Sequence, residues 1–473
     1  MYYLCFSVVG AGSAGAVLAS RLSEDPSLSV LLLEAGGSNE NYFLSDIPLA
    51  APELQRGDAD WNFVSTPQKN AMTALVDNVN FMPSGRLLGG SSSINYMLYT
   101  RGSRHDYDQW AKEGCDGWSY KDVLPYFIKS EDNRVPWLQD SCKENHITCV
   151  QVFIKLAKHV SSSVFGERDY VYFYQLLHFA IICNRFEHAT LTTKDGVRAS
   201  TANAFLRKAS QRPNVDISVN SHVTKVLIKN KSAYGVEFIR GARKHKVHAR
   251  REVIVSTGSV NTPKILMLSG IGPKMHLKSL NIPLEADLPV GENLQNHVGA
   301  PLYFFPNISL TITPDKAGTI WNKFLYATSG KDLILKSTEK NQNGFTILVN
   351  LLHPKSIGSV TLQSKDPFDP PIMEPEFLAD RQHVATLIKG VKRALELGNT
   401  DTFKNLGINL DDTYIKFPEC VQFKIPSEEY LECYIRHYLL AMYHYSSTCR
   451  MGKTEDPTSV VDSKLRYHVQ HIV

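Results

Sequence analysis

The chain has 473 residues, of which 43% are hydrophobic and 21% charged, and it is long enough for two or three domains. A formal net charge of +4 does not predict nucleic-acid binding. No apolar stretch reaches the roughly 18 residues that a membrane-spanning helix needs, and eight cysteines in a chain of this length do not indicate a disulfide scaffold. Composition therefore predicts a soluble globular protein.

The first strong signal lies at the amino end, where the apolar run Leu4–Val9 is followed by the glycine turn Gly10–Gly15 and a helix-compatible segment. In such a strand–turn–helix unit, Gly10 permits the tight turn, Gly12 allows a pyrophosphate to approach, and Gly15 lets the helix pack on the strand. Free N–H groups at the helix N-terminus would bind the pyrophosphate. The cofactor contacts predicted here are Gly10, Gly12, Ser13, Ala14 and Gly15.

A second strand-like run, Ser29–Leu33, ends in an acid that strengthens this interpretation. A glycine turn alone is weak evidence, because such turns also occur in proteins without nucleotides. Glu34 lies 19 residues after Gly15, close to the spacing expected of a ribose-binding acid. Glu34 and the adjacent Ala35 are therefore predicted cofactor contacts. The acid favours a free 2′-hydroxyl, so FAD or NAD is expected rather than NADP.

Three other segments could indicate export, polyanion binding or a metal site, and each has a structural explanation. Met1–Val9 lacks a basic region and a cleavage site before the glycine turn, so it is interpreted as a strand and no export signal is expected. The basic run Arg240–Arg251 lies between two strand-like segments, as a solvated hairpin would. Cys142, His146 and Cys149 lack a fourth ligand, so no metal site is predicted.

The next informative block contains a loop rich in glycine and serine. Gly89–Ser93 does not suit a helix interior, because glycine and serine favour caps and turns. Ile94–Tyr99 then resumes an apolar pattern. A loop of this kind presents N–H groups and hydroxyls to a flavin ring or a phosphate, and a plain flexible turn is an equally good explanation from spacing alone.

At this point the sequence resembles a known family. Gly85–Asn95, continuing to Tyr99 and Gly102, resembles the first signature of the glucose-methanol-choline (GMC) oxidoreductases, and Gly258–Gly272 is similar to the second. Both lie downstream of the glycine turn, in the family's order. The resemblance implies FAD rather than NAD. It also implies cofactor contacts at Leu88, Gly89, Gly90, Ser91, Asn95, Tyr96, Met97 and Leu98.

Two further segments resemble the family on either side of the second signature. Within Val219–Val226, the match implies that Val223 meets the adenine end of FAD through its backbone. Leu288–His297 resembles a flavin-side loop, with Asn296 where the family usually has Asp. Ile94 occupies the position at which some relatives have a flavin-linking histidine, so noncovalent FAD is expected.

The carboxyl-terminal part has regular helical and strand patterns. Ser359–Gln363 alternates like a half-buried strand. Apolar residues from Val384 to Leu395 recur at helical spacing, with Asp380 upstream and a stop at Gly398–Asn399. A second helix is predicted from Ser427 and leads towards a histidine-containing motif.

That motif supplies the candidate catalytic residue. Oxidation of an alcohol requires a base for the hydroxyl proton, and imidazole suits this step because its pKa lies near the working pH. Tyr443–Gly452 resembles the GMC motif that holds the catalytic histidine, which implies that His444, one of sixteen histidines, is the base. The family's proline and glycine after this histidine are replaced by Tyr445 and Ser447, so a different loop path is an open alternative.

The end of the chain departs further from the family. Val460–Arg466 resembles the run towards the family's last strand, and the sequence stops at Val473. The family's second catalytic His or Asn and its closing helix have no counterpart here, so the GMC region is expected to be truncated. His468 and His471 lie next to the terminus and are interpreted as frayed rather than catalytic.

Together these observations predict an α/β protein of the GMC fold, incomplete at its end, with a Rossmann-like FAD-binding domain and an α+β substrate-binding domain. The predicted regions are 1–298 for FAD binding, with 134–191 atypical, 299–353 as a shortened substrate-domain connection, and 354–473 as a truncated C-terminal region. The resemblance implies oxidation of a sugar or primary alcohol, with hydride transfer to flavin N5 and electrons passed to a quinone-type acceptor, in a branch that is often secreted. A catalytically impaired FAD-binding remnant and an NAD dehydrogenase are the alternatives, although the second leaves both signatures unexplained.

Overall fold

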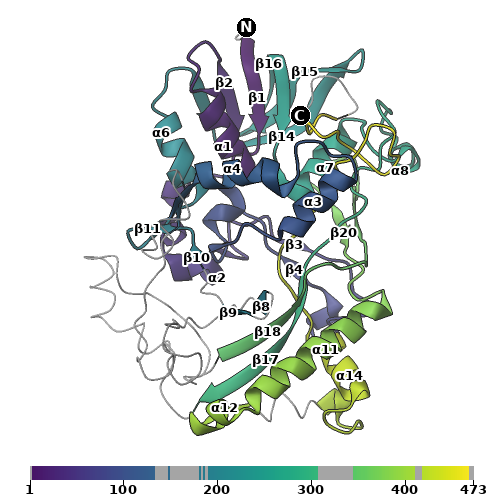
Figure 1. Cartoon of the computed structure of the whole chain (residues 1–473). Coiled ribbons are helices and arrows are strands. Elements are labelled where there is room, and N and C mark those ends of the chain that lie inside the picture. The colour runs from purple at the N-terminus through teal and green to yellow at the C-terminus, as the bar shows by residue number, and fades with distance from the viewer. Residues whose placement is uncertain are drawn as a thin grey trace.

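The computed structural model describes residues 3–133, 147–149, 181–182, 185–186, 190–306, 345–410 and 418–467. These residues form two halves, one around a large sheet near the N-terminus and one around a smaller sheet covered by long helices (Figure 1). Cys142, His146, the side chain of Cys149, His468 and His471 lie outside the described residues. The same is true of most of the atypical stretch 134–191.

The first half is built on a six-stranded sheet, and the strand predicted at the amino end lies near its centre. β1 (Tyr3–Val9) pairs in parallel with both β2 (Val30–Leu33) and β16 (Arg243–Val255). The glycine turn follows β1 directly and leads into α1 (Ser13–Leu22). The full order is β13 (Val215–Ser218), β2, β1, β16, β15 (Ser232–Arg240) and β14 (Ser221–Lys229). The Rossmann-like prediction is confirmed, because the core strands are parallel and buried, as in sheets covered on both faces.

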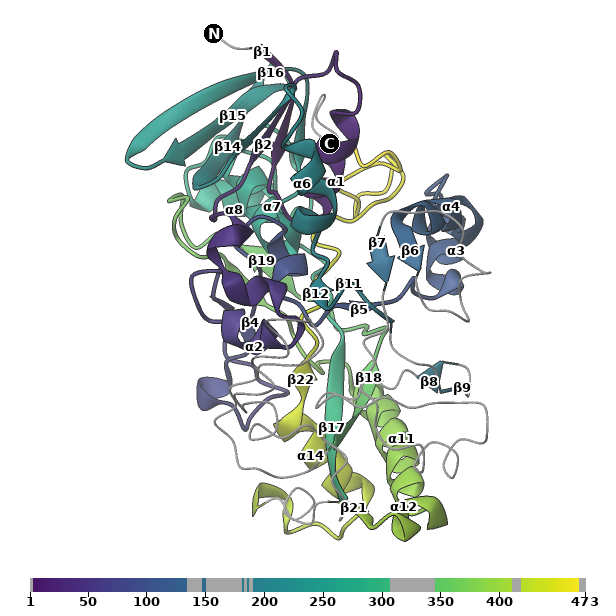
Figure 2. The same ribbon diagram turned by 90° about the vertical axis from the view of Figure 1, so that its left-hand side faces the viewer.

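The basic run Arg240–Arg251 forms an antiparallel hairpin, as predicted. Arg240 at the end of β15 pairs with Arg243 at the start of β16. Lys244 and Lys246 lie 3.1 and 3.8 Å from the Glu237 carboxylate and are more than half exposed. The ribbon of β14, β15 and β16 extends beyond the rest of the sheet at the upper left of Figure 2.

The second half is a small antiparallel sheet packed against two amphipathic helices. β17 (Val298–Pro306) pairs with β18 (Phe345–Leu351), β21 (Ile408–Leu410) and β22 (Leu440–Ala441). α11 (Arg381–Gly398) and α14 (Glu428–Tyr438) bury one face each against this sheet. A disulfide between Cys420 and Cys433 attaches α14 to the preceding turn.

Both helices begin where the sequence predicts. The Asp380 side chain accepts a hydrogen bond from the Gln382 N–H at 2.8 Å, and Ser427 caps α14 through the Tyr430 N–H at 3.2 Å. The predicted strand within Ser359–Gln363 is also present, as β19 (Ser359–Thr361) with only its middle residue fully buried. It pairs with β20 (Ile372–Glu374).

The remaining α-helices and strands lie outside these two sheets. The helices are α2 (Ala51–Leu54), α3 (Arg104–Lys112), α4 (Tyr120–Ser130), α6 (Arg207–Ala209), α7 (Gly258–Leu268), α8 (Lys274–Ser279) and α12 (Asp401–Asn405). The short strands are β3 (Phe63–Val64), β4 (Phe81–Met82), β5 (Leu98–Tyr99), β6 (Glu131–Asn133), β7 (Ile147–Cys149), β8 (Ile181–Ile182), β9 (Arg185–Phe186), β10 (Thr190–Leu191), β11 (Thr193–Lys194) and β12 (Val197–Arg198). Among the described helices, none combines the length and the apolar character required to span a bilayer.

The carboxyl-terminal segment returns from the second half to the first. Val460, Val461 and Tyr467 are buried in the core that also contains Leu4 and Val9 of β1. On the way, the Gly291 N–H donates to the Thr448 carbonyl at 2.8 Å. The chain therefore passes beside the carboxyl ends of the parallel strands, where the glycine turn also lies. The predicted domain boundaries at 298 and 353 remain a prediction.

We expect Gly15→Ala to destabilise the fold strongly. A Cβ at this position would lie 1.9 Å from the Gly10 carbonyl oxygen, and neither backbone segment can move without separating α1 from β1. Overpacking of this kind should lower the free energy of unfolding by about 3 kcal/mol or more, measured by urea denaturation. Gly12→Ala is the matched control, because its Cβ would lie 3.8 Å from the nearest neighbour, the Gly90 Cα. Equal losses in both variants would contradict this explanation.

Candidate active site

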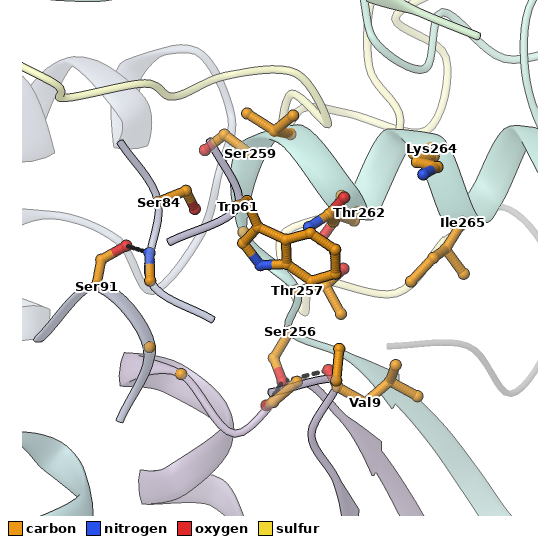
Figure 3. Close-up of a pocket in the computed structure, with 18 of the residues that line it drawn as sticks. Val9, Trp61, Ser84, Ser91, Ser256, Thr257, Ser259, Thr262, Lys264 and Ile265 are labelled. Carbon is orange, nitrogen blue, oxygen red and sulfur yellow. Dashed lines mark hydrogen bonds between the residues drawn. The ribbon is translucent and has the colours of Figure 1, made fainter. Parts of the chain in front are cut away.

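A cavity of about 640 Å³ opens at the carboxyl edge of the parallel strands. Figure 3 shows Trp61 beside it, with Ser256 and Thr257 below and the first turns of α7 above. The Ser256 hydroxyl donates to the Val9 carbonyl at 2.9 Å, which ties the ends of β16 and β1 together. The predicted cofactor residues that line the cavity are Gly10, Gly12, Ser13, Ala14, Glu34, Ala35, Gly90, Ser91 and Val223.

The glycine turn forms a cradle without side chains at one end of this cavity. Gly10 has φ +90°, a conformation that favours glycine. Gly12 is the residue before α1 and has no side chain to cap the helix, and Ser13 and Ala14 in the first turn of α1 line the cavity. A Cβ on Gly90 would lie 2.6 Å from the Gly12 Cα. The two glycine-containing loops therefore meet backbone to backbone, and the cradle suits a pyrophosphate.

Glu34 is held in place by two backbone N–H groups. Its Oε2 accepts from Ala11 and its Oε1 accepts from Gly36, each at 2.9 Å. Burial raises the pKa of the Glu34 carboxyl to about 7, although these hydrogen bonds and the charge of Arg86 act in the opposite direction. Each carboxylate oxygen can accept a further hydrogen bond. Ribose hydroxyls, which donate, fit this position.

Several predicted cofactor residues do not line the cavity. Gly15 packs against Gly10 instead, which is its predicted structural role. The Asn95 Oδ1 accepts from the Met97 N–H at 3.0 Å and from Arg198 Nη1 at 2.9 Å, so this side chain is engaged with the neighbouring backbone and a buried guanidinium. The others outside the lining are Leu88, Gly89, Tyr96, Met97 and Leu98, all in the segment around Gly90 and Ser91.

An aromatic group beside Val223 was not predicted. His222 stacks on Phe368 with ring centroids 4.9 Å apart and meets Trp61 edge-on at 5.7 Å. Burial, followed by the charge of Lys264, lowers the pKa of His222 to about 4, so the ring is neutral near pH 7. A neutral aromatic surface suits an adenine ring. The sequence contained no signal for it, because these rings come from three distant segments.

Lys264 is a buried cation in the same cavity. It lies in α7, is only 5% exposed and lines the pocket. Burial lowers the pKa of its ammonium to about 8, against the opposing effect of Asp369 and Asp366. It is therefore mostly charged near pH 7 and suits an anionic cofactor. The second signature contains Lys264, yet the motif match alone assigned no role to it.

His444 lies at the rim of the cavity. Its two neighbours, Tyr443 and Tyr445, belong to the lining, whereas His444 itself does not. The His444 N–H donates to the Asn296 Oδ1 at 2.8 Å. Its ring meets the His297 ring edge-on, with the two Nδ1 atoms 3.0 Å apart. His297 was not predicted as a functional residue, although it ends the segment Leu288–His297 that resembles a flavin-side loop.

The loop after His444 adopts a backbone conformation that suits glycine. Ser447 has φ +71°, in the left-handed region. The family's glycine is expected at this position, so the serine occupies a glycine-type conformation. A different backbone path at Ser447 is therefore not needed. The serine in this conformation introduces local backbone strain.

The fold and the cavity together define a dinucleotide-binding protein of the α/β class, and comparisons with known proteins identify its family. A sequence model described as GMC oxidoreductase matches residues 6–299, and a second with the same description matches residues 354–471. The chain belongs to the GMC oxidoreductase family. These enzymes depend on FAD, and the glycine cradle, Glu34 and the buried Lys264 of this chain fit that cofactor. The NAD interpretation is thereby excluded.

The similar proteins include dehydrogenases and oxidases. Glucose dehydrogenase [FAD, quinone] of Drosophila pseudoobscura pseudoobscura is 34% identical over 99% of this chain and 81% of its own length. Mitochondrial choline dehydrogenase of Mus musculus is 31% identical over 98% of this chain and 82% of its own length. In structure, pyridoxine 4-oxidase from Mesorbium loti matches with a TM-score of 0.79 at 23% identity, covering 99% of this chain and 93% of that one. The last comparison confirms the GMC fold.

We expect the contribution of Glu34 to the stability of the cofactor-free protein to fall as the pH rises from about 4.5 to about 7, while His222, with its lowered pKa, contributes in the opposite direction over much of this range. Between these values the unfolded chain has lost the Glu34 proton while the folded chain retains it, so folding is favoured at the acidic end. A shift of this size corresponds to about 3 kcal/mol. Urea unfolding of the wild type and of Glu34→Gln across this range measures the effect. An identical pH dependence in both proteins would contradict it.

We expect Ser447→Gly to stabilise the protein. Glycine adopts φ +71° without steric cost, which relieves the strain but adds freedom to the unfolded chain. The net gain should reach up to about 1 kcal/mol, seen as a higher midpoint of thermal unfolding. Ser446→Gly, at the adjacent residue without a positive φ, should show no such gain, and equal gains in both would argue against strain at Ser447.

Proposed function

We propose that this protein oxidises a primary alcohol or a sugar hydroxyl and that His444 is the base that removes the hydroxyl proton. The supporting observation is the position of His444 between two residues of the cofactor cavity, Tyr443 and Tyr445. In this reaction the hydroxyl proton goes to the imidazole and a hydride leaves the adjacent carbon. FAD, when bound, supplies the hydride acceptor.

The chain's own residues have distinct tasks in binding the cofactor. The glycine cradle and the start of α1 would bind the pyrophosphate, Glu34 the ribose, and the aromatic group around His222 the adenine. Lys264 would offset the negative charge of the cofactor. Ile94, at 3% exposure, has no nucleophilic atom, which supports noncovalent FAD.

The substrate class is inferred from relatives with different donors. Glucose and choline, which appear in the names of two similar proteins, both contain a hydroxyl on carbon. The name of the first also contains quinone, which supports a quinone-type acceptor for this chain. A sugar or primary alcohol as donor and a quinone as acceptor are therefore the proposed partners.

The test is reduction of the bound flavin by an alcohol in the absence of oxygen. Purified protein loaded with FAD should lose its visible flavin band when mixed with glucose, choline or a panel of primary alcohols. Removal of the base should slow this step by roughly 100-fold or more. His444→Ala should therefore keep its flavin band after mixing, while a quinone should restore the band in reduced wild type.

His245→Ala is the matched control, because His245 is an exposed histidine on the β15–β16 hairpin. It should behave as the wild type. Bleaching of His444→Ala at a rate close to that of the wild type would contradict the base assignment. Bound FAD without bleaching by any alcohol would instead favour the catalytically impaired remnant.

A further inference from the structure

The contact between His297 and His444 restricts which ring nitrogens can be protonated. The two Nδ1 atoms are 3.0 Å apart, which is a hydrogen-bond distance, and the rings are perpendicular. A contact between two such nitrogens needs one proton, held by one of the rings and accepted by the other. The two possible arrangements have opposite consequences for the remaining nitrogen of His444.

The backbone around His297 distinguishes the two arrangements. The Leu352 carbonyl acts on the pKa of the His297 ring as a hydrogen-bond partner, and a carbonyl can only accept. Since His297 Nδ1 faces His444, the N–H that the carbonyl accepts belongs to Nε2. A neutral imidazole has one N–H only, so the Nδ1 of neutral His297 is an acceptor.

The environment of His297 favours the neutral ring. Burial, followed by the nearby His353, lowers the pKa of His297, while the Leu352 carbonyl and the charge of Asp106 act in the opposite direction. His353 is itself engaged with Asp106 through a contact of 2.8 Å. His297 is therefore neutral near pH 7, and the proton in the contact belongs to His444.

We infer that His297 is a positioning residue for His444: its Nδ1 accepts the His444 Nδ1–H and fixes the tautomer in which the His444 Nε2 has the lone pair. This inference rests on the proposed function, because it assigns the base to one atom. When the substrate hydroxyl loses its proton, the O–H bond breaks and an N–H bond forms at Nε2. His444 becomes positively charged, and its Nδ1–H bond to His297 is retained and strengthened.

Backbone contacts hold the two rings in this relation. The Met442 N–H donates to the His297 carbonyl at 3.0 Å, and the His444 N–H donates to the Asn296 Oδ1 at 2.8 Å. Gln295 and Ser446 exchange backbone hydrogen bonds at 3.0 and 3.1 Å. The backbone of the segment that contains His297 is thus paired with the segment that contains His444.

The kinetic test compares two substitutions at His297. His297→Leu removes the acceptor, whereas the Oδ1 of His297→Asn can replace Nδ1. With an alcohol that reduces the wild type, His297→Leu should lower kcat roughly 100-fold with KM changed less than about threefold, and His297→Asn should stay within roughly tenfold of the wild type. Equal losses in both variants, or no loss in His297→Leu, would overturn the inference. Flavin content and circular dichroism of each variant check folding.

A second measurement does not depend on turnover. Long-range ¹H–¹⁵N spectra of histidine-labelled holoprotein report which nitrogen of each ring is protonated, with His444→Ala and His297→Leu used for assignment. The wild type should show Nδ1–H on His444 and Nε2–H on His297. An Nε2–H tautomer of His444 would overturn the inference even if the enzyme is active. If no alcohol reduces the flavin, the proposed function fails, while the spectra still decide the tautomer.

Discussion

The backbone pairing between the loop that follows residue 288 and the segment that follows α14 is the contact on which the site depends. It begins at Gly291 and Thr448, continues through Gln295 and Ser446, and ends where Val298 of β17 faces Ala441 of β22. Two segments about 150 residues apart thereby become neighbours. Without this pairing, neither the cavity wall formed by Tyr443 and Tyr445 nor the contact between the two imidazoles would exist.

Burial rather than ion pairing sets the electrostatics of the cavity. The pKa of Glu34 is raised, and those of His222 and Lys264 are lowered, with desolvation as the largest cause in each case. The protein maintains these groups in an environment that disfavours their charged forms. A cofactor that donates hydrogen bonds to the acid and brings negative charge to the lysine would reverse part of that cost, which couples cofactor binding to stability.

Structural features that depend on a local sequence pattern could be predicted from the sequence. The strand–turn–helix at the amino end, the basic hairpin, and the helices capped by Asp380 and Ser427 follow from periodicity and capping, and the structure contains all of them. Glu34 could be proposed as a cofactor contact from its spacing to the glycine turn alone, and it lines the cavity. The aromatic group of Trp61, His222 and Phe368 could not, since only the fold brings these residues together.

The same distinction applies near the proposed base. The motif match pointed to His444, but the ring that contacts it comes from a loop whose resemblance to the family pointed to the flavin rather than to a histidine. Asn95 illustrates the opposite case: the signature predicts a cofactor contact, whereas its side chain is engaged by Arg198. Replacement of glycine by Ser447 indicated a possible change of path, and only the backbone angle shows that Ser447 has a conformation that favours glycine.

The β15–β16 hairpin also contributes much of the positive charge on the surface of the protein. From residue 225 to residue 251 the only acid is Glu237, and the exposed cations include Lys225, Lys229, Arg243 and Arg250. The small formal net charge of +4 is thus the sum of a strongly positive ribbon and a remainder of the chain that is negatively charged. The ribbon therefore concentrates positive charge at one edge of the sheet. It attracts anions over a distance that dissolved salt limits to about 8 Å at physiological ionic strength.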